Sequence, residues 1–439
     1  MTRLRQFWYD VRSSFWFVPA LMLVAAIVLA LVLIDIDTRL AGDFFARWPR
    51  LFGAGAEGAR GLLGTIAGGV ISVAGVVFSI TLVALSLASS QYTSRVLRHF
   101  MRDRANQFVL GSFVGIFAYC LVVLRTIRGA DEGSFVPALA VLVGLLMGLA
   151  GIAVLVFFIH HISASIQASQ ILATVADETV RGIDRLFPPD AGPATDDTDA
   201  PMPAAAGQVW HPVLAERTGY IEQVDVEVLL VLAVGHSAVL RLERGIGDFV
   251  VEGTAIVSLL AARPPTGADA TRLRASFSVG RARTLDQDVA FGIRQLADVA
   301  LKALSPGIND STTAEMCLDR LGEILLRLAD RRIAGHRHGA DGRLRLVGCG
   351  PTYEALVNEG LDPVRRNAAG NVSVLARLFE VLRTAGAYTR LPGRRRVLLG
   401  HAQAAAELAR RSIEAPRDRA RLDGLAALVV AELSAPAAG

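Results

Sequence analysis

The sequence predicts an α-helical membrane protein with four transmembrane helices, followed by a cytoplasmic α+β region that contains a small β module and ends in helices. Of its 439 residues, 52% are hydrophobic and only 20% are charged, a composition too apolar for an ordinary soluble enzyme. Four runs, at residues 15–34, 62–88, 108–127 and 135–159, approach the roughly 20 apolar residues that cross a bilayer. After Ile159 no comparable run occurs, and strand-like and then helical patterns follow.

The first apolar run is expected to remain as a span. It is about 20 residues long, longer than the core of about 7–15 residues in a secretory signal, and the LIDIDTRL behind it offers no small-x-small cleavage site. Arginines in short segments then orient the bundle. The N-terminal tail contains three and SRVLRHFMRDR, between the second and third runs, contains four. Both segments, and with four spans everything after His160, are therefore predicted to be cytoplasmic.

These patterns divide the chain into five parts. Residues 1–160 form the predicted transmembrane domain. Residues 161–187 continue as a helical stalk, whose apolar stripe needs a partner, either the same helix of another subunit or the cytoplasmic end of the second span. Residues 188–207, rich in Pro, Ala, Gly and Asp, form a predicted disordered linker. Residues 208–265 form the β module and residues 266–439 a mainly helical domain.

The second span, TIAGGVISVAGVVFSITLVALSLASSQYT, contains small residues at regular intervals. Steps of seven from Thr65 and from Gly61 define two heptad seam positions, and nine of the ten seam residues are Gly, Ser or Thr. Such a face indicates contact with protein or water rather than lipid, and its repeat favours a left-handed crossing. The helix over 61–93 would be about 50 Å long, so its end should project into the cytoplasm. The candidate face consists of Thr65, Gly68, Ser72, Gly75, Ser79, Ser86, Ser89 and Thr93.

Two main interpretations of this face remain open. It is either a tight helix-helix seam within the four-span bundle or the lining of a water-filled path in a homo-oligomer; a lipid or small-ligand groove is a third option. None of the four apolar runs contains Asp, Glu, Lys or His, and Arg125 lies near a span end, where it can snorkel. Ion-coupled pumps normally keep ionisable groups at mid-depth, so a passive path or no path is favoured.

The β module is indicated by the short runs GYIEQVD, AVLRLER and AIVSLL, which are separated by turn glycines. The segment resembles the biotinyl/lipoyl-type barrel-sandwich domains. Their Gly-Asp-x-Val-x-x-Gly-x-x-Ile/Leu hairpin is matched by Gly247, Asp248, Val250, Gly253 and Ile256. Carrier domains of that type present an acylated lysine, and this segment contains no lysine. The resemblance therefore implies a structural or adaptor module.

The densest polar signal is RTLDQDVAFGIRQLADVALKALSPGINDSTT. It predicts a helix from near Thr284 to before Pro306 and a second helix with Asn309 or Asp310 as N-cap. The first turn of the second helix is either an anion site, because free amides and the helix dipole attract phosphates, or a well-capped turn. The residues of this candidate anion-binding or structural turn are Arg281, Arg283, Asp288, Gln295, Asp298, Lys302, Ser305, Asn309, Asp310, Ser311 and Thr312.

The remaining segments carry no catalytic pattern. A short strand RLRLV and helices at about 361–385, 394–413 and 415–433 are predicted. No P-loop, zinc spacing or Gly-x-Ser-x-Gly is present, so no cofactor and no metal are expected. His336 and His338, in GHRHGADG, fit an exposed turn, with a metal role as the alternative. The net charge of +4 makes no case for nucleic acid.

Three stretches together carry a resemblance to a family. They are TIAGGVISVAGVVFSITLVALSLASSQYTSRVLRHFMRDRANQ, GDFVVEGT and RTLDQDVAFGIRQLADVALKALSPGINDSTTAE. They resemble the predicted membrane proteins grouped as domain of unknown function 2254. The resemblance implies a multi-span protein of the bacterial cytoplasmic (inner) membrane with a cytoplasmic portion and no assigned activity, and it supplies no catalytic residues.

Three functional hypotheses follow. The leading one is an oligomeric membrane protein whose second span lines a passive ion or solute path gated by the cytoplasmic module. The second is a non-conducting, membrane-anchored sensor or scaffold that binds a small anionic ligand at SPGIND. The third is a membrane-tethered enzyme that uses Asp288, Asp298 or Lys302, although no nucleophile-base pairing is visible in the sequence. The expected partners are the lipid bilayer and further copies of the chain.

Overall fold

The chain forms two compact units, Met1–Gln167 and Ala168–Gly439, called here the N-terminal and C-terminal units. The structure is a computed structural model. It describes residues 16–39, 55–91, 104–128, 135–165, 167–188, 208–285, 287–329, 331–333, 335–348 and 350–435. Thr93 and nearly all of the predicted linker 188–207 lie outside these residues.

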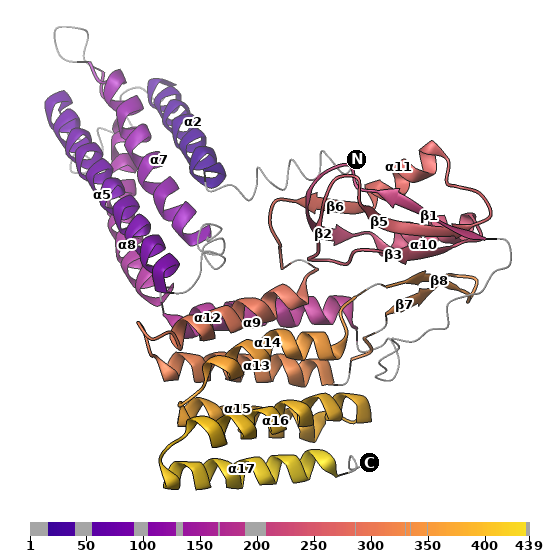
Figure 1. Ribbon diagram of the computed structural model, residues 1–439. Coiled ribbons are helices and arrows are strands. Elements are labelled where there is room, and N and C mark those ends of the chain that lie inside the picture. The colour runs from indigo at the N-terminus through magenta and orange to yellow at the C-terminus, as the bar shows by residue number, and fades with distance from the viewer. Residues whose placement is uncertain are drawn as a thin grey trace. The chain divides into compact units, whose positions relative to one another are not determined.

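The N-terminal unit contains the four predicted apolar helices (Figure 1). They are α2 (Phe17–Arg39), α5 (Ala56–Gln91), α7 (Arg104–Thr126) and α8 (Ala138–Ser165). Each is long and apolar enough to cross a membrane, which confirms the four-helix prediction. The second helix begins earlier than the apolar run suggests, and its 36 residues extend over about 54 Å.

Helix α7 is the central helix of this unit and packs against α2, α5 and α8. Half of its apolar window is buried, against 11–17% for the other three. Glycines on α7 and α8 allow the close approach. A Cβ at Gly111 would lie 3.0 Å from the Pro19 Cα, and a Cβ at Gly148 would lie 3.2 Å from Ile66 side-chain atoms. These packing glycines were not among the residues predicted from the sequence.

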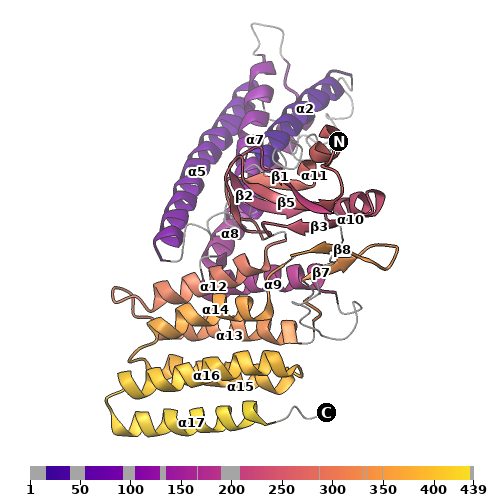
Figure 2. The same cartoon turned by 45° about the vertical axis from the view of Figure 1, so that its right-hand side comes forward.

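The C-terminal unit stacks its helices in successive layers, and Figures 1 and 2 show the same order from two directions. Helices α9 and α12 form one layer, followed by α13 with α14, then α15 with α16, and finally α17. The helices are α9 (Ala168–Leu186), α12 (Val289–Ala303), α13 (Ser311–Ala329), α14 (Tyr353–Asn367), α15 (Val372–Tyr388), α16 (Pro392–Ser412) and α17 (Pro416–Ser434).

Two helix predictions for the C-terminal unit were wrong. Helix α12 starts at Val289 rather than near Thr284, because Asp288 is its N-cap and accepts a hydrogen bond from the Phe291 amide. The single helix expected at 361–385 is divided into α14 and α15. Gly370 takes a left-handed φ of +76° and Asn371 caps α15, so the helix stops although the apolar periodicity continues.

The apolar stripe of α9 packs on α12 and α13 of the same chain. Leu172, Val175 and Ile183 are buried on this face. The sequence analysis expected another subunit or the second span as the partner of this stripe. In the structure the partner is the pair α12 and α13 of the same chain. Asp184 extends the contact, because it accepts two hydrogen bonds from Arg327, at 2.8 and 2.7 Å, and one from Arg331 at 2.6 Å.

The β module consists of two sheets that share one core. The first has the order β1-β5-β3-β8-β7, in which β3 and β8 run parallel, and the second has the order β4-β2-β6. Strands β6 to β8 complete the two sheets, and they come from outside the range 208–265 that the sequence predicted for the β module. The elements are β1 (Val209–Leu214), β2 (Gly219–Val224), α10 (Val226–Gly235), β3 (Val239–Leu242), β4 (Phe249–Val250), β5 (Ala255–Ala261), α11 (Gly267–Ala275), β6 (Phe277–Gly280), β7 (His336–His338) and β8 (Leu344–Val347).

Candidate functional site

The candidate face of α5 points away from the other helices of the N-terminal unit. Leu63, Val70, Val77 and Ala84 are buried in the bundle. The residues two positions later, Thr65, Ser72, Ser79 and Ser86, are all exposed. Two residues span about 200° of an α-helix, so the two sets lie on opposite sides of α5. The described helices of one chain therefore pack on the face opposite to these hydroxyls.

The glycines of this face meet nothing within the described chain. A Cβ added at Gly61, Gly68 or Gly75 would have no heavy atom within 4 Å, apart from its own helix and chain neighbours. The hydroxyls of Thr65, Ser72 and Ser79 donate to the carbonyls of these same glycines, at 2.8, 2.8 and 2.9 Å. Each donor is thus satisfied one turn earlier in the helix. We call the exposed residues 61, 65, 68, 72, 75, 79 and 86 the α5 stripe.

The far end of the predicted face is only partly described. Ser89 lies within α5, but its side chain is outside the described residues, as is the whole of Thr93. The exposed position 82 of the heptad is Leu82, which is the one bulky residue in the repeat. The described stripe therefore runs over residues 61–86.

The turn between α12 and α13 is closed by its own residues. Asp310 accepts hydrogen bonds from the amide and the hydroxyl of Thr313, and these hydrogen bonds hold the pKa of its carboxyl below the usual value. Asn309 takes a left-handed φ of +51°, which asparagine tolerates. Ser311 accepts a hydrogen bond from Asn371 at 2.6 Å. The N-terminus of α13 thus already holds a carboxylate of the same chain, as in a capped turn.

The basic residues predicted to assist an anion site, Arg281, Arg283 and Lys302, do not gather at this turn. Arg283 lies before the start of α12 and Ser305 follows its end, so a helix of 15 residues, about 22 Å, separates the two. Arg281, two residues before Arg283, is exposed. Lys302 is exposed in the last turn of α12, and Ser305 donates its hydroxyl to the Lys302 carbonyl at 2.6 Å.

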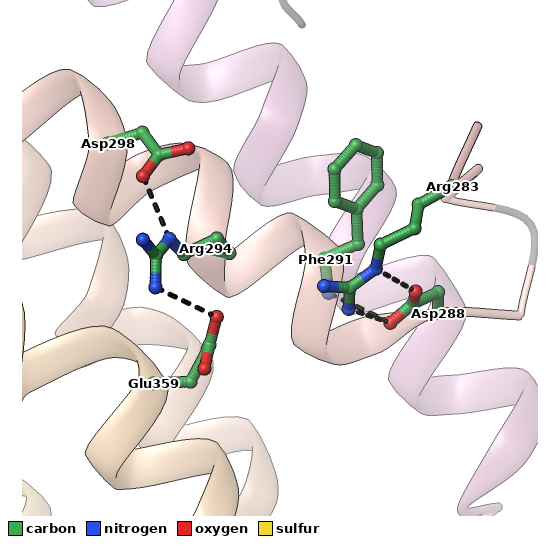
Figure 3. A network of polar contacts seen from close by, with 6 residues as sticks. All are labelled: Arg283, Asp288, Phe291, Arg294, Asp298 and Glu359. Carbon is green, nitrogen blue, oxygen red and sulfur yellow. Dashed lines mark hydrogen bonds and ion pairs between the residues drawn. The ribbon is translucent and has the colours of Figure 1, made fainter. Parts of the chain in front are cut away.

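Two arginines, Arg283 and Arg294, form ion pairs one after the other along α12 (Figure 3). Arg283 donates to both oxygens of the Asp288 carboxylate, at 2.7 and 2.9 Å, and its guanidinium lies 5.0 Å from the Phe291 ring centre. Further along, Arg294 donates to Asp298 at 2.8 Å and to Glu359 of α14 at 3.4 Å. Both aspartates considered as enzyme residues are therefore engaged by an arginine.

The Arg283–Asp288 pair is strongly shielded from solvent. The Asp288 side chain is 3% exposed and the Arg283 side chain 25%. Burial acts to lower the pKa of Arg283, but the hydrogen bonds and the charge of Asp288 outweigh burial and raise the pKa above its usual value. Gln295, also a predicted site residue, is buried on the same helix.

The sequence reasoning missed the residues that surround this pair. Gly247, which carried the barrel-sandwich resemblance, has a φ of +86°, and a Cβ there would overlap the Asp288 carboxylate and lie 3.0 Å from the Arg283 Nε. The Gln287 side chain accepts a hydrogen bond at 3.0 Å from the amide of Val224, the last residue of β2. The spacing of Gly247 from Asp288 in the sequence carries no signal of this contact.

Metal-binding chemistry has no support within the described part of the chain, where no three His, Cys, Asp or Glu side chains lie together as ligands. His336 and His338 stand on β7 with their ring centres 5.4 Å apart in an edge-to-face contact. The two histidines lie in the edge strand of the first sheet, not in an exposed turn as the sequence suggested.

The fold defines a membrane protein with four apolar helices followed by a mixed α/β region and a helical C-terminus. Residues 12–384 match the family described as predicted membrane protein DUF2254, and the chain belongs to this family. Its relatives include the Uncharacterized protein Rv1290c of Mycobacterium tuberculosis and the Uncharacterized protein Mb1321c of Mycobacterium bovis. Each is 32% identical over 375 residues, which cover 84% of this chain and 71% of the relative. No solved structure matches the chain.

Proposed function

We propose that the protein is a homo-oligomeric, channel-like protein of the bacterial cytoplasmic membrane. In this proposal α5 of each copy turns its stripe toward a shared axis and lines a passive path for ions or small solutes, while the C-terminal unit regulates that path from the cytoplasm. One observation carries the proposal: the α5 stripe is exposed in the single chain and lies opposite to the face that packs.

The glycines of the stripe favour this arrangement over a stripe that faces lipid. A glycine inside a helix costs about 1 kcal/mol relative to alanine. Glycine is therefore expected where another backbone or water approaches closely. Within the described chain nothing approaches Gly61, Gly68 or Gly75, which is the arrangement expected if a second copy or a water-filled path lies beside them.

The chemistry of the stripe fits a passive path. Its residues are Gly, Ser and Thr, without an ionisable group. The hydroxyls donate within the helix, but their lone pairs stay free to accept from water or a hydrated ion. A pump driven by ion binding would need ionisable side chains at mid-depth.

Cysteine substitution tests the proposal directly. In full-length protein with Cys120, Cys317 and Cys349 replaced by alanine, we expect Ser72→Cys and Ser79→Cys to react with a charged, water-soluble thiol reagent and to cross-link copies of the chain. The matched controls are Val70→Cys and Val77→Cys, which lie on the buried side of α5. Reaction at Ser79→Cys should also reduce ion flux into liposomes. Equal reactivity of the two sets would contradict the proposal, as would absence of flux where a control channel conducts.

The alternative of a non-conducting sensor that binds an anion at residues 305–312 has less support, because the Asp310 carboxylate already fills the first turn of α13. Calorimetric titration of the full-length protein with inorganic phosphate distinguishes the two functions. We expect no binding. Saturable binding that Asp310→Asn strengthens would favour the sensor.

A further inference from the structure

The first turn of α12 touches two separate parts of the C-terminal unit. On one side it meets the hairpin loop 245–248 of the β module, and on the other it meets α9. Helix α9 follows the last apolar helix after residues 166 and 167. From these contacts we propose that this turn couples the β module to α9, so that a displacement of the hairpin loop changes the stability of α9.

The contact with the β module is polar and leaves no free space. Gly247 lies against the Arg283–Asp288 pair, and a Cβ at this position would overlap the Asp288 carboxylate. The loop itself is held to β2, because the Gly247 amide donates to the Ile221 carbonyl at 2.8 Å and the Ile221 amide donates to the Asp248 carbonyl at 3.0 Å. A shift of the loop therefore meets a buried carboxylate that also caps α12.

In the contact with α9, a glycine of each helix lies against a side chain of the other helix. A Cβ at Gly292 would overlap the hydroxyl of Thr179 and lie 2.9 Å from its Cβ, and Thr179 itself is 1% exposed. One turn further along α9, a Cβ at Gly182 would lie 3.6 Å from Val289 and 3.8 Å from the Leu285 carbonyl oxygen. The hairpin loop touches Asp288, and α9 touches Val289. These two residues are adjacent, so both contacts involve the same turn of α12.

Buried side chains at such contacts move between discrete arrangements rather than deforming gradually, so a disturbance on one side is expected to reach the other. Such coupling is reciprocal: disturbing α9 must weaken the hairpin as well. The proposal goes beyond the channel-like function and holds whether or not the N-terminal unit conducts.

Hydrogen exchange of the full-length protein in nanodiscs, followed by mass spectrometry, tests the coupling. The disturbance is Gly247→Ala, and the matched control is Gly253→Ala. Both glycines have a left-handed φ, +86° and +82°, but a Cβ at Gly253 would meet nothing within 4 Å. Backbone strain is thus shared, and only the contact with the ion pair differs. We expect exchange in peptides from α9 to be about two- to thirtyfold faster in Gly247→Ala than in Gly253→Ala.

The reciprocal pair of variants lies on α9. Gly182→Leu pushes a side chain toward Val289, whereas Arg181→Leu alters the neighbouring exposed position. We expect faster exchange in residues 245–253 for Gly182→Leu alone. Helix α17, in the layer farthest from α12, reports global unfolding. If Gly247→Ala unfolds the whole C-terminal unit, exchange in α17 rises as well. The comparison of Gly182→Leu with Arg181→Leu then tests the proposal.

The proposal is overturned if α9 exchanges at the same rate in Gly247→Ala and Gly253→Ala, or if residues 245–253 are unaffected by Gly182→Leu. Arg294→Met supplies a further control. It breaks the ion pairs of Arg294 with Asp298 of α12 and Glu359 of α14, neither of which belongs to the β module (Figure 3). It should leave the exchange of both α9 and residues 245–253 unchanged. An equal increase in this variant would mean that any damage to α12 gives the same signal.

Discussion

The carboxylate of Asp37, near the end of α2, accepts hydrogen bonds from the backbone amides of Leu139 and Ala140 at the start of α8, at 3.1 and 3.0 Å. More than 100 residues separate the partners in the chain. The first amides of a helix lack partners within it, and Asp37 supplies one from a different helix. Tyr119 adds a second link, because its hydroxyl donates to the Ala140 carbonyl at 2.7 Å.

Asp37→Ala is expected to destabilise the N-terminal unit by about 1–2 kcal/mol, because the loss of a helix cap leaves buried amides without an acceptor. Thermal unfolding of the detergent-solubilised protein, followed by circular dichroism, measures the change. The control is Asp35→Ala, which removes an exposed carboxylate paired with Arg39 on the same helix and should change stability by less than about 0.5 kcal/mol. Equal effects of the two substitutions would contradict the assignment.

Glycines of α7 and α5 should respond differently to added volume. Gly111→Val forces atoms against the Pro19 backbone and is expected to destabilise the fold of the single chain by about 1–3 kcal/mol. Gly68→Val adds the same atoms where no described neighbour lies within 4 Å. We expect it to leave the unfolding temperature nearly unchanged and to lower the oligomer fraction in native mass spectrometry. Unfolding temperatures that fall equally would show that Gly68 is also a packing residue of the single chain.

Arg394 is fully buried and caps α13, donating to the carbonyls of Leu328, Ala329 and Arg331 at 2.7, 2.9 and 2.9 Å. Arg394→Met should cost about 3 kcal/mol or more, because it leaves buried carbonyls without their donor. Arg394→Lys should recover only part of the loss, since an ammonium lacks the fork of the guanidinium.

Arg396→Met is the matched control, because this arginine is exposed two residues along the same helix. It should change stability by no more than about 0.5 kcal/mol. Urea unfolding of the full-length protein in detergent measures all three variants. A loss in Arg396→Met as large as that in Arg394→Met would show that the run of arginines acts through its charge rather than through the cap.

Asp184 gives the attachment of α9 a dependence on acid pH. Hydrogen bonding from Arg327 lowers the pKa of the Asp184 carboxyl, and the charges of Arg327 and Arg331 lower it further. Burial acts in the opposite direction but is outweighed, so the pKa lies below the ordinary 3.8. A lowered pKa means that the stabilisation is present above pH 4 or so and is lost as the pH falls through the lower, folded-state value.

Asp184→Asn should therefore lower the urea midpoint at pH 7, and its difference from the unchanged protein should shrink steadily below about pH 4. Asp423→Asn, in an exposed pair with Arg410 at 3.6 Å, should show little difference at either pH. A gap between Asp184→Asn and the unchanged protein that stays constant down to pH 3 would rule out this ion pair as its cause.

Much of the local structure could be predicted from the sequence, because helix formation depends on neighbours three and four residues apart. The four apolar helices follow from run length, and an N-cap at Asn309 or Asp310 follows from the place of these residues before a helix. The hydrogen bond from the Thr313 amide assigns the cap to Asp310. Strands β2, β3 and β5 follow from short runs between turns. The break between α14 and α15 escaped prediction, because it depends on one glycine and one cap within a continuing apolar pattern.

By itself the sequence determined that α5 has one face of small, hydroxyl-bearing residues; only the tertiary structure decided that the opposite face packs in the chain. Likewise, the sequence contains RRR at 394–396, but the fold alone makes Arg394 a buried cap and leaves Arg396 exposed. The physical reason is the same in both cases. Periodicity records which residues share a face, whereas the partner of that face is set by side chains many residues away, which local pattern does not encode.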